Sequence, residues 1–275
     1  MARHFNYLGY NNLILVDDFK QRQKEYNWKG IKNYAIVERD ELFQWLEREV
    51  VKLNYVIHLG ARTDTTEFDY AVHEKLNIEY SKKIWNYCVA YNVPLIYASS
   101  AATYGAGEYD YDDNHDISHL KPLNPYGVSK NEFDKWAINN KQAPVFWAGL
   151  KFFNVYGPGE YHKGRMASVV FHAYNQIQEY GSVKLFRSHR SEFADGEQLR
   201  DFIYVKDILK VITWMMQHPI RSGLYNLGTG KARSFIDLVR GVYKALDMEP
   251  DIEFVDIPND IRGCLLYTSP SPRDS

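Results

Sequence analysis

The stretch Val93-Pro-Leu-Ile-Tyr-Ala-Ser-Ser-Ala-Ala-Thr-Tyr-Gly105 joins an apolar run to a segment rich in hydroxyl groups. The apolar part predicts a buried strand, because short aliphatic and aromatic runs are typical of the centre of a parallel sheet. A second stretch, Pro125-Tyr-Gly-Val-Ser-Lys130, begins a helical pattern downstream. A hydroxyl group at a strand end, with a Tyr and a Lys one helical turn apart, is what an enzyme needs to move a proton while a nicotinamide moves a hydride.

Strand and helix patterns alternate outward from these two stretches. The alternation predicts an α/β fold with a doubly wound, parallel Rossmann-type sheet, in which ligands bind at the carboxyl ends of the strands. Polar residues, including Asp17, Gly60 and Asn154, follow the expected strands. Strands are expected at residues 13–16, 31–37, 54–60, 94–98 and 145–152, and helices at 41–52, 71–91 and 126–139.

The alternation is less strict after about residue 155. We expect residues 1–155 to form the cofactor-binding Rossmann domain, and residues 156–263 to form mainly a smaller substrate lobe with interleaved Rossmann elements. Further strands are expected at residues 183–186, 201–205 and 223–227, and helices at 168–180, from 207 and from 234.

Both ends of the chain depart from the pattern. A dinucleotide-binding fold begins with a strand and a glycine-rich turn that holds phosphates. Here residues 3–10 read as the end of a helix with no such turn before it, so we expect a fragment that lacks the first strand of the sheet. Residues 264–275 do not continue the preceding pattern and are interpreted as a tail that is not native.

The composition argues against several kinds of partner. The 33 Lys and Arg residues nearly balance the 35 Asp and Glu residues, so no nucleic acid or anionic membrane is expected as a partner. No run of about 18 apolar residues predicts a membrane span, and the first residues are too polar for a signal peptide. Cys88 and Cys264 have no metal-like spacing, so no metal site is expected, and the cytoplasm is the expected location.

Tyr126 and Lys130 are four residues apart and therefore share one face of a helix. We expect the Lys130 ammonium to favour the phenolate and to lower the pKa of Tyr126 toward the working range. The spacing alone is not specific, because the chain has 22 Tyr residues and contains a second match at Tyr180 and Lys184. Ser99 and Ser100 upstream favour the functional interpretation over a merely packed aromatic ring.

Other polar residues near the strand ends have two interpretations each. Ser100 could bind a substrate oxygen or satisfy backbone groups where the strand ends. Asp17 could accept a hydrogen bond from a ribose hydroxyl or close a turn. Lys24 and Arg39 could meet a 2′-phosphate or be solvated charges.

Two basic segments in the second half of the chain also have two interpretations each, as substrate contacts or as surface charges. His162 and Lys163 follow a strand end, where they could face the substrate, although a basic cluster such as residues 162–165 is usually a solvated loop. Arg200 could donate two hydrogen bonds to a phosphate, or form a surface ion pair with Asp201 or Glu197.

Several segments together resemble the extended short-chain dehydrogenase/reductases that act on nucleotide sugars. They are residues 58–61, 97–105, 122–130, 153–158, 200–205 and 225–230. Within that class, residues 162–172 and 184–201 resemble the ADP-L-glycero-D-manno-heptose 6-epimerase family. Ala101 and Ala102 also fit this family better than the 4-epimerases. They stand where a dehydratase usually has an Asp-Glu pair.

The resemblance implies an isomerase that inverts C6″ of ADP-D-glycero-β-D-manno-heptose on the route to lipopolysaccharide core heptose. It implies transient oxidation by bound NADP, with NAD as the alternative cofactor, and a cytoplasmic homo-oligomer, commonly a pentamer. The alternatives are another nucleotide-sugar 4-epimerase or 4,6-dehydratase, or an inactive fragment that keeps only the fold.

The resemblance also assigns roles to matching residues. The implied catalytic residues are Tyr126, Lys163, Ser100 and Lys130, with Tyr126 and Lys163 on opposite sides of the sugar. The implied cofactor contacts are Asp17, Asp18, Lys24, Arg39, Leu59, Gly60, Ala61, Arg62, Thr63, Asn77, Lys130, Val155 and Lys163. The implied substrate contacts are Ser100, Asn154, Arg165, His172, Phe186, Arg187, Ser188, His189 and Arg200.

Overall fold

The computed structural model describes residues 1–256 apart from residues 33, 66, 189–190, 192 and 219. A parallel sheet contains four strands in the order β3 (Val56–His58), β4 (Leu95–Ser100), β5 (Trp147–Phe152) and β9 (Gly223–Leu227). Ser100 of β4 lies opposite Phe152 of β5, so these two strands end level with one another.

A second parallel pair is formed by β1 (Leu13–Asp17) and β2 (Tyr34–Glu38). Within the described residues, no strand pairs with both β1 and β3, so this pair and the four-stranded sheet are separate hydrogen-bonded units. β2 begins three residues later than the 31–37 pattern indicated.

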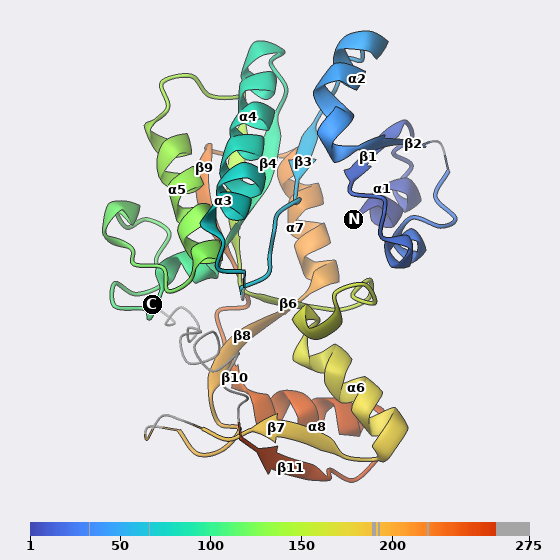
Figure 1. The fold of residues 1–275 in the computed structure, drawn as a ribbon, viewed down its shortest axis with the longest axis vertical. Helices are drawn as coiled ribbons and strands as arrows, with labels where there is room; N and C mark the ends of the chain where they lie inside the picture. Colours follow the sequence, from blue (N-terminus) through green and yellow to red (C-terminus); the bar gives the residue numbers. More distant parts are fainter. Residues whose placement is uncertain (33, 66, 189–190, 192, 219, 257–275) are drawn as a thin grey trace.

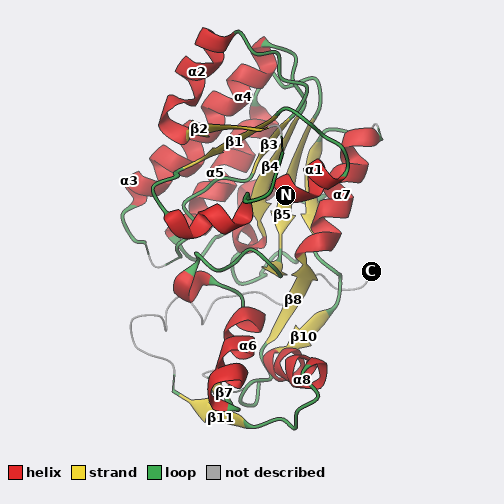
Figure 2. Ribbon diagram, turned by 90° about the vertical axis from the view of Figure 1, so that its right-hand side faces the viewer, coloured by secondary structure: helices red, strands yellow, loops and turns green. Residues whose placement is uncertain are grey.

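Helices cover both faces of the four-stranded sheet (Figures 1 and 2). α4 (Tyr80–Ala90) and α5 (Pro125–Asn139) lie on one face, whereas α1 (Ala2–Tyr7) and α7 (Val205–Gln217) lie on the other. α2 (Leu42–Glu49) packs beside β2.

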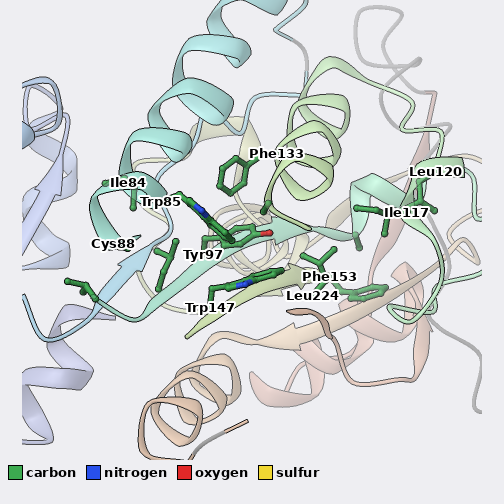
Figure 3. Close-up of a cluster of buried hydrophobic side chains, with 14 of the residues drawn as sticks. Ile84, Trp85, Cys88, Tyr97, Ile117, Leu120, Phe133, Trp147, Phe153 and Leu224 are labelled. Carbon is green, nitrogen blue, oxygen red and sulfur yellow. The ribbon is translucent and has the colours of Figure 1, made fainter. Parts of the chain in front are cut away.

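Two apolar clusters form on the two faces of β4, because successive side chains of a strand point to opposite sides. Tyr97 packs with Trp85 of α4 and Phe133 of α5 (Figure 3). Ile96 packs with Ile212 of α7 on the other face. A parallel sheet buried on both faces is the arrangement of a doubly wound fold, so the predicted fold class is confirmed.

A third apolar cluster lies at the end of the molecule opposite α2 and α4 (Figure 1). It joins α6 (Val169–Tyr180), α8 (Phe235–Ala245), β7 (Val183–Phe186) and β11 (Ile252–Val255). β7 and β11 form a parallel pair, and Ser234 caps α8 by accepting a hydrogen bond from the Asp237 N–H, where the helix was expected to begin.

A sheet of three strands contains β10 (Ala232–Ser234), β8 (Leu199–Tyr204) and β6 (Asn154–Tyr156), in that order. The sequence patterns missed β6 and β10, which have three residues each, and β11, which has four. Such runs are too short to show a period. The division of the chain at residues 155 and 263 stays a prediction.

The helix expected over residues 71–91 consists of three segments. α3 (Tyr70–His73) leads into a π-helical segment, Glu74–Glu79, which leads into α4. Single π-helical turns within α-helices are rare and are frequently found at functional sites. Asn77, one of the implied cofactor contacts, lies in this π-helical segment.

The remaining helical segments are short 3₁₀ turns. They are Arg22–Asn27, Arg39–Glu41, Ala101–Tyr104, Ile117–His119 and Gly164–Met166. Of the helices in the described part of the chain, none has the length and apolar character needed to span a bilayer.

Candidate active site

The end of β4 is a turn that hydroxyl groups stabilise. Ser100 Oγ accepts a hydrogen bond from the Ala102 N–H at 3.1 Å, and the Thr103 hydroxyl donates to the Ser100 carbonyl at 2.8 Å. Ser and Thr side chains often satisfy backbone groups in this way. Thr103 thus serves the backbone, whereas the Ser100 side chain also forms a hydrogen bond with Tyr126.

The start of α5 holds Tyr126 against this turn. Asn124 caps the helix by accepting a hydrogen bond from the Gly127 N–H at 2.8 Å, and Pro125 occupies the first turn. A Cβ atom at Gly127 would lie 2.8 Å from the Ala102 carbonyl oxygen, closer than real Cβ contacts. Glycine therefore lets α5 approach the turn after β4 and brings Tyr126 within reach of Ser100.

Lys130 lies beneath Tyr126 and is 4% exposed. Its Nζ donates a hydrogen bond to the Ala98 carbonyl of β4 at 2.9 Å. Burial lowers the pKa of Lys130 to about 8, and the negative charge of Asp134 opposes part of that change. Near neutral pH, Lys130 is therefore mostly a cation, but one that loses its proton more readily than a solvated lysine.

Burial raises the pKa of Tyr126, the hydrogen bond from Ser100 opposes this effect, and the charge of Asp134 adds to it. The expectation that Lys130 lowers the pKa of Tyr126 toward the working range is therefore wrong for this structure. Desolvation of the phenolate has the larger effect.

Asn77 fastens the loop after β3 to α5. Its Oδ1 accepts a hydrogen bond from the Arg62 N–H at 2.7 Å, and its Nδ2 donates to the Arg62 carbonyl at 3.0 Å and to Ser129 Oγ at 2.9 Å. The fully buried Asn77 side chain thus positions the loop that contains Leu59, Gly60, Ala61 and Thr63. These loop residues follow β3 at the edge where β4 also ends.

The implied cofactor residues near β1 and β2 form ion pairs. Asp17 at the end of β1 lies 2.8 Å from Lys24, and its carboxylate also accepts a hydrogen bond from the Asp18 N–H at 2.8 Å. Arg39 lies 3.0 Å from Asp40, and this hydrogen bond raises the pKa of the guanidinium. Partly exposed ion pairs contribute little net stability, so Lys24 and Arg39 can change partner at little cost.

Lys163 lies on an exposed loop whose two ends are held together by hydrogen bonds to the Glu160 carboxylate. Glu160 is 6% exposed and accepts hydrogen bonds from the Gly157 N–H at 3.0 Å, the Ser168 N–H at 2.6 Å and the Ser168 hydroxyl at 2.8 Å. The Lys163 N–H also donates to the Glu160 carbonyl at 2.9 Å. The structure brings Ser100, Tyr126 and Lys130 together, and it places Lys163 on this separate loop.

The Lys163 loop approaches the first strands. His162 Nδ1 lies 3.4 Å from Asn27 Nδ2, and Arg165 lies 3.9 Å from Asp64. Burial lowers the pKa of His162, and the charges of Lys24 and Lys163 lower it further. The loop therefore faces the residues that follow β1 and β3.

The implied substrate residues lie on several elements. Asn154 Nδ2 donates to the Asp201 carbonyl at 3.1 Å, and the Ser188 N–H donates to Asp195 Oδ1 at 2.8 Å. Arg200 is 8% exposed with its guanidinium 5.6 Å from the Phe235 ring centroid. Among the other implied substrate contacts, His172 lies on α6, and Phe186 and Arg187 lie at the end of β7. Val155, an implied cofactor contact, lies on β6. His189 lies outside the described residues.

The donor set at the strand ends fits a nicotinamide cofactor. Ser100 and Tyr126 present hydroxyl groups beside the Lys130 ammonium. Among the described residues, this ammonium donates one hydrogen bond, to the Ala98 carbonyl. An ammonium group has three N–H donors, so Lys130 can also bind ribose hydroxyls. Among the described residues, no cluster of His, Cys, Asp and Glu side chains could hold a metal ion.

Sequence patterns missed Asp134 and Lys151, which lie directly behind this site. Lys151 is inside the apolar run of β5, and Asp134 is inside α5. A charged residue within a run that otherwise predicts a buried strand is a signal that could have found Lys151.

Comparison with known proteins identifies the family of this chain. Residues 1–228 match the NAD dependent epimerase/dehydratase family. A Fusobacterium nucleatum protein named ADP-L-glycero-D-manno-heptose-6-epimerase is 45% identical over 273 residues, which cover 95% of this chain and 82% of the relative.

Solved structures give the same fold. The crystal structure of Helicobacter pylori ADP-L-glycero-D-manno-heptose-6-epimerase matches with a TM-score of 0.78 at 26% identity, covering 99% of this chain and 87% of that chain. A UDP-N-acetylglucosamine 4-epimerase from Methanobrevibacter ruminantium matches with a TM-score of 0.81 at 22% identity, covering 99% and 85%. The fold is thus shared among sugar epimerases, and the sequence relationship is what separates them. The chain belongs to the ADP-L-glycero-D-manno-heptose-6-epimerase family, within the NAD dependent epimerase/dehydratases.

Proposed function

We propose that this protein epimerises C6″ of ADP-D-glycero-β-D-manno-heptose to give ADP-L-glycero-β-D-manno-heptose. The observation that carries the proposal is that Ser100 and Tyr126 come together at the end of β4, next to the buried Lys130, in a chain 45% identical to a relative named for this reaction. That constellation is suited to moving a proton on and off a sugar hydroxyl.

The reaction needs an oxidation step because the hydrogen on C6″ is not acidic. When bound, a nicotinamide cofactor would supply a reversible hydride acceptor, so that the C6″ carbonyl could form and be reduced again on its other face. Ser100 holds the reacting oxygen, and Tyr126 takes the hydroxyl proton as the carbonyl forms. It does so as the minor phenolate form, which the nearby Lys130 ammonium stabilises. Lys130 orients the ribose and provides a positive charge beneath the phenol.

A second proton donor serves the other face of the sugar. We assign this role to Lys163, because its loop faces the residues that follow β1 and β3. Glu160 fixes the backbone of that loop and so limits where the ammonium can reach. Two acid/base groups on opposite sides allow inversion without release of an oxidised product.

The finer cofactor and assembly assignments are part of the proposal. NADP is favoured over NAD, because Lys24 and Arg39 are cations that can pair with a 2′-phosphate. The implied substrate contacts, the cytoplasmic location and the homo-oligomer stay predictions from the family resemblance.

The test is to incubate the chain with ADP-D-glycero-β-D-manno-heptose and NADP and to follow the C6″ proton by NMR. Appearance of the L-glycero signals is the expected result. Turnover of a UDP- or dTDP-hexose with no change in the heptose would overturn the assignment in favour of a 4-epimerase or a dehydratase. A parallel reaction with NAD tests the cofactor assignment.

A further inference from the structure

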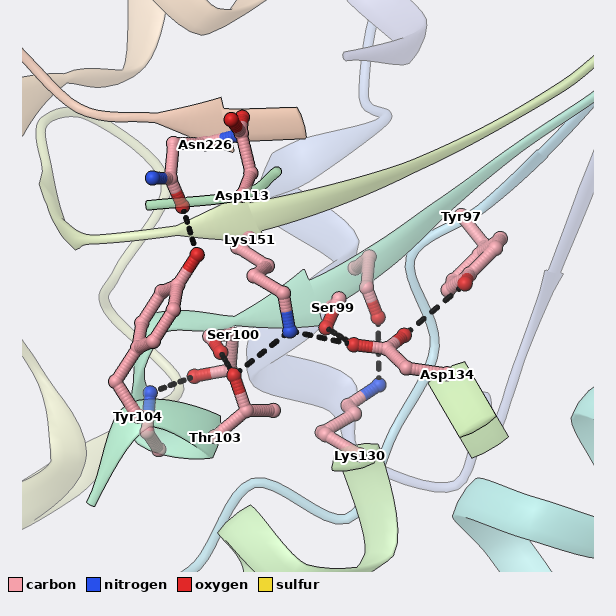
Figure 4. A network of polar contacts seen from close by, with 12 residues as sticks. Tyr97, Ser99, Ser100, Thr103, Tyr104, Asp113, Lys130, Asp134, Lys151 and Asn226 are labelled. Carbon is pink, nitrogen blue, oxygen red and sulfur yellow. Dashed lines mark hydrogen bonds and ion pairs between the residues drawn. The ribbon is translucent and has the colours of Figure 1, made fainter. Parts of the chain in front are cut away.

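A buried ion pair lies behind the candidate active site (Figure 4). Asp134 of α5 and Lys151 of β5 are both 0% exposed, and Lys151 Nζ lies 2.8 Å from Asp134 Oδ2. Asp134 also accepts hydrogen bonds from the Tyr97 hydroxyl at 3.0 Å and the Ser99 hydroxyl at 2.6 Å. The carboxylate therefore has three donors from two strands, which is close to full satisfaction of its hydrogen-bonding capacity.

The pair is connected to the catalytic residues by hydrogen bonds. Lys151 Nζ donates to Thr103 Oγ1 at 2.8 Å, and the Thr103 hydroxyl donates to the Ser100 carbonyl at 2.8 Å. Ser100 in turn forms the hydrogen bond to Tyr126. Lys151 Nζ also lies 5.2 Å from the Tyr104 ring centroid, which adds a cation–π contact at the same turn.

A role in folding alone does not account for this arrangement. Removing two charges from water is costly, and apolar residues of similar size often stabilise a core as well as a buried ion pair does. Here the pair contacts Tyr97 and Tyr104, which belong to the main apolar cluster. Among the described residues, its hydrogen bonds lead through Thr103 and Ser100 toward Tyr126.

The charge of Asp134 acts on both catalytic residues of α5. Asp134 raises the pKa of Lys130 against the effect of burial, and it raises the pKa of Tyr126. The other groups around these two are Ser100 from β4, the Ala98 carbonyl, the ring of His73 at 6.5 Å from that of Tyr126, and His58, whose pKa Lys130 helps to lower. Asp134 is thus the carboxylate whose charge reaches Tyr126 and Lys130, and Lys151 is its ion-pair partner.

We propose that Asp134 and Lys151 are positioning residues, which hold the turn after β4 against Tyr126 and set the charge balance beneath Tyr126 and Lys130. This inference rests on the proposed function for its catalytic consequence. Its physical content, the coupling of the pair to Lys130, is a property of the protein alone.

The coupling can be measured without substrate by titrating Lys130. Lysine labelled with ¹³C at Cε reports each ammonium by NMR, and the Lys130→Met variant identifies the signal. Asp134→Asn removes a negative charge and is expected to lower the pKa of Lys130 by about one pH unit. Lys151→Met leaves Asp134 without its counter-charge and is expected to raise that pKa by a similar amount.

The double variant, Asp134→Asn with Lys151→Met, removes both charges. It leaves neither partner behind as an unpaired buried charge, so it keeps the test usable if a single variant fails to fold. Its Lys130 pKa should return to within about half a pH unit of the original. Asp201→Asn is the matched control, because Asp201 is a fully buried carboxylate in a different place, where it accepts hydrogen bonds from Thr229. An unchanged Lys130 titration in both charge variants, or an equal change in the Asp201 variant, would overturn the inference.

Turnover then tests the catalytic consequence separately. In the double variant, Thr103 loses its donor from Lys151, so we expect kcat to fall about tenfold with little change in KM. Restoration of the Lys130 pKa with full kcat would show that the pair sets the charge but does not position the turn. Absence of heptose turnover in the unmodified chain would reject the proposed function and leave the titration result intact.

Discussion

The two proposed proton donors belong to regions that are built differently. Tyr126 starts a capped helix, contacts Ser100 through a hydrogen bond and lies over buried charges. Lys163 is exposed and lies on a loop that is held by backbone hydrogen bonds to Glu160. The Tyr126 side chain is held by its own contacts, whereas in the described part of the chain the Lys163 loop is held by hydrogen bonds of its main chain to Glu160.

The difference has a chemical meaning for a reaction that inverts a centre. In the proposed mechanism, the first proton transfer occurs beside a strand end, where geometry and charge are set before substrate binds. The second donor must meet a carbonyl that has turned within the site, and a flexible side chain on a fixed loop can follow it. Substitutions in the two regions should therefore differ in how activity and stability change together.

The largest effect is expected from Tyr126→Phe. The phenyl ring cannot exchange a proton, so kcat for the heptose should fall on the order of 10³-fold. Tyr180→Phe is the control, because Tyr180 and Lys184 repeat the same spacing at an exposed helix end. Steady-state rates measured by NMR should separate the two variants. Equal rates would remove Tyr126 from the mechanism.

Lys163→Met should reduce epimerisation by about 10²-fold or more, because one face of the carbonyl loses its proton donor. The melting temperature should not change, since the side chain is exposed. Incubation with an aldehyde analogue and reduced cofactor should still give hydride transfer to one face. Lys184→Met, an exposed lysine of β7, serves as the control. Retention of full epimerase activity by Lys163→Met would exclude the two-donor account.

The sequence predicted those elements of the fold that hydrophobic periodicity alone determines. Alternating apolar strands and amphipathic helices identified β1, β4, β5 and β9 and the helices between them, because periodicity depends only on local pattern. The expected helix starts near residues 126 and 234 were also correct, and both follow a residue whose side-chain oxygen caps the helix, Asn124 and Ser234.

The remaining features depend on contacts between distant segments. The π-helical segment before α4 places Asn77 on Arg62 and Ser129, which are fifteen and fifty-two residues away in the chain. The direction of the Tyr126 pKa change follows from burial, which a four-residue spacing does not reveal. The pairing of Asp134 with Lys151 required knowing that α5 packs over β5.

A smaller effect is expected from Glu160→Gln, which keeps the size of the side chain. Gln has one oxygen in place of two, so either the Gly157 or the Ser168 N–H loses its acceptor. The free energy of unfolding should fall by about 1–3 kcal/mol, and kcat by about tenfold as the Lys163 loop loosens. Urea denaturation and steady-state rates measure both quantities. Glu253→Gln, at the exposed ion pair with Lys184, should change neither.

The smallest effect concerns the pH dependence of stability in the buried region. The pKa of Lys130 is about 8 in the folded chain and has the ordinary value of 10.5 when unfolded, so between these values the unfolded state binds more protons. Stability from this group therefore rises with pH from about 8 to 10.5 and is constant below pH 8. Relative to Lys130→Met, the unfolding free energy of the unmodified chain should increase by about 1 kcal/mol per pH unit in that window. Lys163→Met, on the exposed loop, should show no such difference in urea denaturation at pH 7, 8, 9 and 10. A flat difference for Lys130→Met would mean that the site beneath Tyr126 is as well solvated as the loop, and the contrast between the two regions would be lost.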